Sequence, residues 1–153
     1  MKFILLMISL LVAGTVSAFD QIYLNRLLET NICHHCTLSD ADLHGKTLDN
    51  ADMSEAHLEN INLSNASLVG AWFTHSKMQN ANLEGANISS TLFDYTDLTA
   101  ANLKGSNLNG AKLNFSDLTN ANLTGATIKN TVLRGVKFCN TTMPDGKINN
   151  SGC

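Results

Sequence analysis

Charge of either sign is scarce in this chain, and so are the motifs of most enzyme classes. Only 15% of the 153 residues are charged, and the formal net charge at pH 7 is −3. So small an imbalance supports neither a nucleic-acid-binding surface nor a strong mimic of DNA. The sequence also has no Gly-rich phosphate loop, no Gly-x-Ser-x-Gly elbow and no pair of carboxylates in a predicted pocket. We therefore expect no nucleic-acid partner, no cofactor and no enzymatic activity.

A long hydrophobic run is missing as well. The apolar segment Phe3–Ala13 is shorter than the about 20 residues that a membrane-spanning helix needs. It follows the positively charged start Met1-Lys2 and precedes the small-residue site Val16-Ser17-Ala18, an arrangement typical of a secretory signal peptide. We expect residues 1–18 to be cleaved and the mature chain to start near Phe19; an uncleaved membrane anchor is the alternative. No cysteine follows the cleavage site, so a lipid anchor is not indicated.

The mature protein should then be exported without membrane insertion. The periplasm or the extracellular medium fits these signals, as does a thylakoid lumen if the source is a cyanobacterium.

The most regular feature of the sequence is a period of five. From Leu38 to Met143 every fifth residue is apolar, in 22 consecutive units. With 44% of residues apolar, such a run has a chance probability on the order of 10⁻⁸. The unit is small, polar, apolar, polar, polar, and its small position holds Ala, Ser, Thr or Cys in 19 of the 22 units, the exceptions being Lys46, Ile61 and Val136. A period of five fits neither an α-helix nor a simple strand, so the chain must turn a corner in every unit.

This run, over residues 36–143 and about 70% of the chain, resembles the pentapeptide-repeat family, whose motif is commonly written Ala-Asp/Asn-Leu-x-x. The resemblance implies an all-β solenoid: a right-handed quadrilateral β-helix with one unit per side, four per coil and about five and a half coils. Residues 20 apart should then lie above one another at a spacing of about 4.8 Å. One inner column would contain Met53, Phe73, Phe93, Leu113 and Leu133, so that the two Phe rings stack.

The implied solenoid also pairs the four cysteines. Cys33 and Cys36 would lie at the first coil, and Cys139 and Cys153 at the last, about 24 Å away. Because a disulfide needs Cα atoms within about 7 Å, the expected bonds are Cys33–Cys36 and Cys139–Cys153. An even number of cysteines in the mature part agrees with export.

Segments at both ends are expected to close the solenoid. Residues 19–35 should hold the Cys-x-x-Cys pair and a short capping helix over Asp20–Thr30, and residues 144–153 should form a C-terminal cap closed by a disulfide. The helix should pack on the first coil through its apolar side, made of Tyr23, Leu24, Leu27 and Leu28.

The sequence Cys33-His34-His35-Cys36 has alternative interpretations as a redox centre or half of a zinc site. A redox motif normally lies in a βαβ context, a c-type haem would need His where Thr37 stands, and zinc would need two more ligands. We interpret the pair as a structural disulfide.

Three other residues form a candidate metal set. His35, Glu55 and His75 are 20 residues apart, so they could project side by side from one corner and hold zinc or copper. We expect a solvated corner there without a metal ion. His34, His44 and His57 have no evident partner in the sequence.

Outward apolar residues gather on the side whose inner column contains Phe73 and Phe93. Most other outward positions are polar, so Trp72, Leu92, Tyr95 and Phe115 should cluster on one flat face. Contiguous exposed apolar groups often mark an interface. We expect a homodimer or another protein to bind there; a patch without a partner is the alternative.

These observations predict an exported, non-enzymatic structural or interaction scaffold. The alternative is a metal-binding envelope protein that uses the N-terminal His, Cys and Glu residues. A third hypothesis is a topoisomerase inhibitor, because some members of the family mimic DNA and bind gyrase. The signal peptide, the cysteines and the weak negative charge argue against the third. The charge is also uneven, with a formal −6 on residues 19–60 and +2 on residues 61–153.

Overall fold

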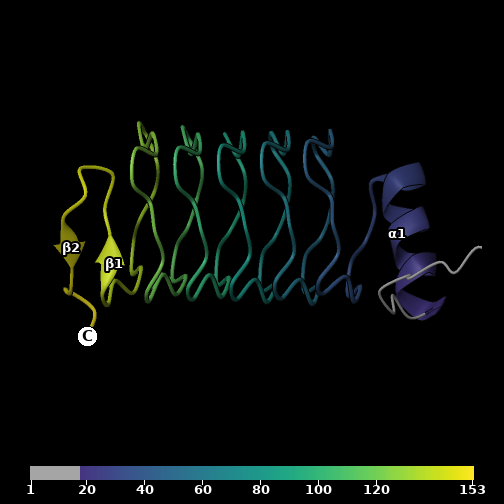
Figure 1. Cartoon of the computed structure of the whole chain (residues 1–153), viewed down its shortest axis with the longest axis horizontal. Helices are drawn as coiled ribbons and strands as arrows, with labels where there is room; N and C mark the ends of the chain where they lie inside the picture. Colours follow the sequence, from purple (N-terminus) through teal and green to yellow (C-terminus); the bar gives the residue numbers. More distant parts are fainter. Residues whose placement is uncertain (1–17) are drawn as a thin grey trace, which may run out of the picture.

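The computed structural model describes residues 18–153. The helix α1 (Ala18–Thr30) is followed by stacked coils, and the chain ends in an antiparallel pair of short strands, β1 (Thr141–Thr142) and β2 (Ile148–Asn149). Figure 1 shows α1 and this pair at opposite ends of an elongated stack. The expected signal peptide lies outside the described residues, except for Ala18. No helix within residues 18–153 combines the length and the apolar character that crossing a membrane requires.

The coils have a period of 20 residues. Parallel β-bridges join residue pairs 20 apart along the whole stack, from Ile32↔Asp52 to Asn122↔Thr142. In the units from Leu38 to Leu123 the apolar residue donates its N–H to a carbonyl of the next coil, as from Leu63 to Asn82 at 2.8 Å. Only one residue per unit is bridged and the rest forms a turn, which explains why the five-residue period produces isolated bridges and few longer strands.

The interior of the stack is filled by the apolar and small positions of the units. Phe73 and Phe93 are fully buried, and their rings stack with centroids 5.1 Å apart and planes 6° from parallel, as expected. Of the three exceptions at the small position, Ile61 is buried, Val136 is partly buried and Lys46 is exposed. The core is therefore continuous from coil to coil.

Hydroxyl residues replace alanine at several small positions without leaving a buried polar group unpaired. Thr91 donates its hydroxyl hydrogen to the carbonyl of Leu68 at 2.8 Å, and Thr96 donates to the carbonyl of Phe73 at 2.7 Å. Both side chains are buried. Each bond crosses to the preceding coil, so these residues add hydrogen bonds between coils at sites where burial would otherwise be costly.

The N-terminal end is covered by α1. Leu27 is fully buried, and Tyr23 and Leu24 are partly buried against the core. Leu28 was expected on the same side but is exposed, because one residue along a helix rotates the side chain by about 100°. The helix ends where Asn31 adopts a φ of 57° and donates its N–H to the carbonyl of Leu27 at 2.9 Å.

The C-terminal end is less completely covered than the sequence suggested. Ile128, Leu133 and Met143 belong to the inner columns but are only partly buried. They pack against the core, but no further coil follows them, and only the tail after Met143 continues beyond this end. The disulfide Cys139–Cys153 ties this tail to the last coil, and Gly152 donates its N–H to the carbonyl of Phe138 at 2.7 Å.

Candidate functional site

One corner of the solenoid carries large side chains where the backbone favours small ones. Every coil turns through residues with positive φ, and three of the four corners use Gly, Asn or Asp there, except at Ser90 and Ala100. The fourth, which we name the bulky corner, has φ values of 56–60° at His35, Glu55, His75, Tyr95 and Phe115. The left-handed conformation costs a residue other than glycine about 1–2 kcal/mol. Such strain clusters at functional sites, so the bulky corner is the first place to seek one.

The C-terminal half of the bulky corner is a ladder of aromatic rings. The ring centroids of His75 and Tyr95 are 4.9 Å apart and those of Tyr95 and Phe115 are 5.2 Å apart, with the rings nearly parallel in both pairs. The guanidinium of Arg134 lies 5.8 Å from the centroid of Phe115. The Phe115 ring also lies over Gly135, where a Cβ atom would approach ring carbon Cδ1 to 2.6 Å. Neighbouring rings thus hold one another in place while remaining open to solvent.

A second apolar column lies beside this ladder. Parallel bridges connect Trp72 with Leu92, Leu92 with Lys112 and Lys112 with Val132. Trp72 and Val132 are exposed, at 51% and 42%, whereas Leu92 is partly buried and contributes less open surface than the sequence suggested. We define the apolar face by five residues of these two columns: Trp72, Leu92, Tyr95, Phe115 and Val132.

The exposed large apolar side chains of residues 21–153 fall into two groups. Three lie at the ends of the molecule, with Ile22 and Leu28 on α1 and Ile148 on β2. The other five lie in the two adjacent columns described above: Ile32, Trp72, Tyr95, Phe115 and Val132. Across the described coils, exposed bulky hydrophobic groups are thus confined to one side.

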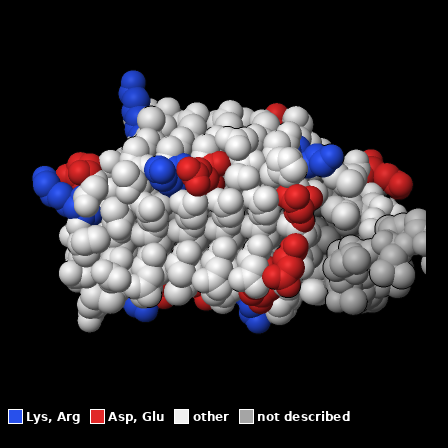
Figure 2. Space-filling model, in the orientation of Figure 1, with Lys and Arg blue, Asp and Glu red and all other residues white. Residues whose placement is uncertain are grey.

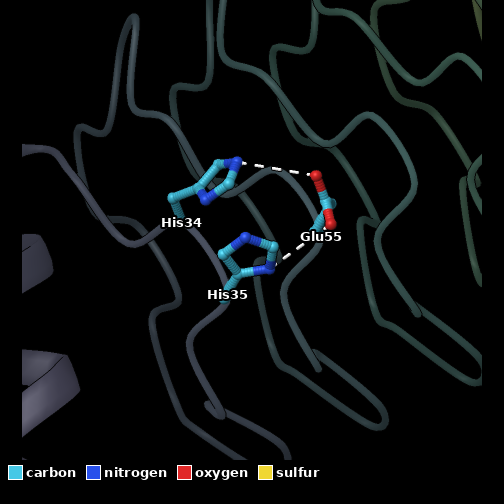
Figure 3. A group of neighbouring side chains, drawn as sticks. All are labelled: His34, His35 and Glu55. Carbon is cyan, nitrogen blue, oxygen red and sulfur yellow. Dashed lines mark ion pairs between the residues drawn. The ribbon is translucent and has the colours of Figure 1, made fainter.

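The N-terminal half of the bulky corner contains a cluster of possible metal ligands. One ligand atom from each of His34, His35 and Glu55 lies within 4.8 Å of the others. His34 Nε2 is 3.7 Å from Glu55 Oε1, and His35 Nδ1 is 3.4 Å from Glu55 Oε2 (Figure 3). The two imidazole rings meet edge to face, with centroids 3.9 Å apart.

This cluster differs from the expected set of His35, Glu55 and His75. The ring of His75 stacks on Tyr95 and is not part of the group. His34, which seemed to lack a partner, takes its place because the bond between Cys33 and Cys36 closes a tight loop around both histidines. Spacing along a column identified two of the three residues, and only side-chain direction identified the third.

His44 and His57 also have carboxylate partners that the sequence did not reveal. His44 Nδ1 is hydrogen-bonded to Asp42 at 2.9 Å, and this contact lowers the pKa of Asp42. His57 Nδ1 lies 3.3 Å from Glu59. Burial acts to raise the pKa of Glu59, but hydrogen bonds, including one from Ser39 at 2.6 Å, outweigh it and lower that pKa. Each of these pairs joins residues two apart, on the outward side of a single unit.

The five-residue units and 20-residue coils match the model of a known protein family. The model of the family described as "Pentapeptide repeats" matches residues 32–70, 47–80, 66–105 and 106–145, with eight copies. These matches together cover residues 32–145, most of the chain. The protein belongs to the pentapeptide-repeat family. Comparison with curated protein sequences finds no match.

Solved pentapeptide-repeat structures resemble this chain to different extents. Rfr23 from the cyanobacterium Cyanothece 51142 is 27% identical with a TM-score of 0.50, and the match covers 81% of this chain and 96% of that one. HetL from Nostoc sp. strain PCC 7120, a protein involved in heterocyst differentiation regulation, is 24% identical with a TM-score of 0.34, covering 77% and 68%. A protein from the Arabidopsis thaliana thylakoid lumen is 28% identical with a TM-score of 0.28, covering 73% and 71%. The likeness to Rfr23 agrees with the right-handed quadrilateral β-helix that membership of the family implies.

Both expected disulfides are present in this pentapeptide-repeat protein. Cys33 is bonded to Cys36 and Cys139 to Cys153, with Cα separations of 5.2 and 4.8 Å. Cys33 and Cys36 are fully buried. A bonded cysteine has no thiolate to offer, so the His34–His35–Glu55 cluster has no sulfur ligand from this loop.

Charged groups are unevenly distributed over the coils. On the face in Figure 2 they are sparse, and the acidic ones lie mainly toward the N-terminal end. Further along the stack, Lys137 Nζ is 3.0 Å from Asp117 Oδ2. Burial acts to raise the pKa of Asp117, but hydrogen bonds from Thr119 and the ammonium group of Lys137 outweigh it, so the pKa of Asp117 lies below its ordinary value.

Proposed function

We propose that this pentapeptide-repeat protein is an exported, non-enzymatic scaffold that binds another protein, or a second copy of itself, through its apolar face. The scaffold consists of about five and a half coils, closed at one end by α1 and at the other by the disulfide-bonded tail. The single observation that carries the proposal is the confinement of exposed bulky hydrophobic groups on the coils to one side.

The character of the apolar face supports binding. Trp72, Tyr95 and Phe115 are each about half exposed, at 51%, 54% and 47%. Tryptophan and tyrosine are enriched among the residues that dominate interface energetics. Stacking and the rigid coils beneath limit the side-chain freedom of this ladder, so a partner would find it already ordered. Tyr95 and Phe115 also occupy left-handed positions that glycine or asparagine would fill at lower cost.

Export is supported by the N-terminal sequence and by the two disulfides. Disulfides persist in oxidising compartments outside the cytoplasm and are rare within it. The modest net charge argues against the alternative of a DNA-mimicking topoisomerase inhibitor, which needs a strongly negative surface.

The test compares capture of partners by three forms of the protein, each purified with its disulfides intact. The first is the wild type, and the second carries Trp72→Ser and Tyr95→Ser. The matched control carries Lys77→Ser and Ala100→Ser, which moves both substitutions by one five-residue unit onto the neighbouring side. Lys77 and Ala100 are exposed, and Ala100 shares the positive φ of Tyr95.

Each form is used as bait against the exported fraction of the source organism, and its oligomeric state is measured by sedimentation. We expect the wild type and the control to retain the same partner, or to form the same homodimer, and the face variant to lose it by at least about 30-fold, as for one residue worth 2 kcal/mol. Thermal unfolding checks that all three forms remain folded. Identical partners and identical masses for all three would contradict the proposal.

A further inference from the structure

We propose that His34, His35 and Glu55 bind one divalent transition-metal ion, copper(II) more tightly than zinc. This site is separate from the apolar face, although both lie along the same bulky corner. It rests on geometry, on the rigidity of the loop and on the chemistry of the three ligands.

The geometry is close to what a metal ion needs. Zinc bonds to His nitrogen and carboxylate oxygen are about 2.0–2.2 Å long, so two ligand atoms at a tetrahedral angle lie about 3.3 Å apart. The two His–Glu55 separations are 3.7 and 3.4 Å, and the two histidines approach different oxygens of one carboxylate. The three ligand atoms all lie within 4.8 Å of one another, so side-chain rotations that shorten these separations would bring them onto a single ion (Figure 3).

The same distances are those of loose ion pairs and not of close hydrogen bonds. Both exceed the 2.7–3.2 Å typical of N–H···O hydrogen bonds. By comparison, His44 and Asp42, an exposed pair on another side of the first coils, lie 2.9 Å apart and are hydrogen-bonded. Other surface pairs are as loose, since His57 lies 3.3 Å from Glu59. What sets this cluster apart is that two imidazoles approach one carboxylate.

The backbone under the cluster is fixed by several constraints. The Cys33–Cys36 disulfide closes the loop that carries both histidines, and both cysteines are fully buried. The N–H of Cys33 donates to the backbone carbonyl of Asp52 at 2.7 Å, and the N–H of His35 donates to that of Ser54 at 3.0 Å. Glu55 is in turn bonded to the following coil, through its N–H to Thr74 at 2.9 Å. A metal ion would therefore order little beyond the side chains, which favours binding.

The ligand set indicates which ions would bind. Two imidazoles and one carboxylate form the His₂Glu donor set of many zinc sites, in which water occupies the fourth position. The cluster is open to solvent, with side-chain exposures of 40%, 60% and 49%, so such a water molecule has access. Copper(II) exceeds zinc in affinity for nitrogen and oxygen ligands in general. The surrounding segment, residues 19–60, carries a formal charge of −6, which attracts cations.

The experiment measures binding of copper(II) and of zinc, each alone, to the untagged, disulfide-bonded protein by isothermal titration calorimetry. The variants are His34→Ala, His35→Ala and Glu55→Gln. The matched controls are His44→Ala, which removes a histidine beside a different carboxylate, and His75→Ala, which removes the residue that spacing alone assigned to the set. Thermal unfolding without metal shows whether each variant is folded.

We expect one ion per chain, copper tighter than zinc, and at least about tenfold weaker binding in each of the three variants. Both controls should bind as the wild type does. Electron paramagnetic resonance of the copper complex should show coupling to two imidazole nitrogens in the wild type and to one in His35→Ala. No saturable binding by the wild type, or an equal loss in His44→Ala, would overturn the proposal. The Trp72→Ser, Tyr95→Ser variant should keep the metal, which separates this outcome from that of the partner experiment.

Discussion

Replacing Phe93 by alanine would test whether the hydrogen-bonded coils keep the backbone in place when a large core side chain is removed. The Phe93 side chain is fully buried, and its ring stacks on that of Phe73. Its N–H donates to the carbonyl of Lys112 at 2.7 Å, and its carbonyl accepts the hydroxyl hydrogen of Ser116 at 2.7 Å. Both partners belong to the following coil, and the adjacent Leu92 donates its N–H to the carbonyl of Ala71 in the preceding coil at 2.9 Å. Hydrogen bonds on both sides thus fix the backbone, and the site cannot contract around a smaller side chain.

The expected loss combines a transfer and a cavity contribution. Exposing the lost ring area corresponds to about 2 kcal/mol of transfer free energy. A residual cavity of roughly 100 Å³ adds about 2.4 kcal/mol at 24 cal/mol per Å³. Phe93→Ala should thus lower the free energy of unfolding by about 4–5 kcal/mol. Phe93→Leu should lower it by less than about 1.5 kcal/mol, because Leu113 and Leu133 occupy the same column.

Guanidinium unfolding, followed by far-UV circular dichroism and by Trp72 fluorescence, provides the measurement. Coincident transitions by the two probes would justify a two-state free energy, which a repeat protein does not guarantee. A double-mutant cycle with Phe73→Leu should add a coupling of about 0.5–1.5 kcal/mol for the stacked pair. A loss below about 2 kcal/mol for Phe93→Ala, or equal losses for alanine and leucine, would refute the reasoning.

Three further predictions concern the C-terminal disulfide, the bulky corner and the loss of stability at low pH. Replacing Cys139 and Cys153 by serine opens a 15-residue loop and should lower the free energy of unfolding, measured with denaturant, by about 3 kcal/mol. An unchanged denaturation midpoint would exclude a stabilising role for this disulfide. Gly135→Ala should lower the free energy of unfolding by about 1 kcal/mol or more and displace the Phe115 ring. Gly105 has a similar φ but open space around it, so Gly105→Ala should lose only the free energy of placing alanine at positive φ. Equal losses in the two variants would show that the contact with the Phe115 ring has no effect on stability. Because the folded pKa of Asp117 is lowered, its stabilising contribution is complete above the unfolded pKa of about 3.9 and is lost as pH falls through the folded value. Stability measured from pH 6 to pH 2 should accordingly fall less in Asp117→Asn than in the wild type, and parallel curves would contradict this assignment.

Much of the fold could be predicted because the repeat is local and strict. A unit with two inward and three outward positions leaves one workable register, and a slip of a single residue would expose the apolar set. That register placed Phe73 above Phe93 and brought Trp72, Tyr95 and Phe115 onto one side. It also separated the two cysteine pairs by the length of the solenoid.

At the two ends, the burial of some apolar residues differs from the prediction because the repeat does not continue there. Leu28 is exposed although its helical spacing placed it inward, and Leu133 is only partly buried although its column is internal. Inside the stack a coil on either side buries each apolar residue. At an end, burial depends on how one helix or one tail lies across the opening, which no periodicity specifies.

The sequence by itself determined the coil period, the inner columns and the side of the molecule on which each residue lies, since these follow from alternating inward and outward positions in a rigid stack. Only the tertiary structure decided which side chains meet on the surface. His75 turns toward Tyr95 and His34 joins His35 and Glu55. The physical reason is that the direction of an exposed side chain is set by ring stacking, loop closure and neighbouring charges, contacts that exist only once the coils are assembled.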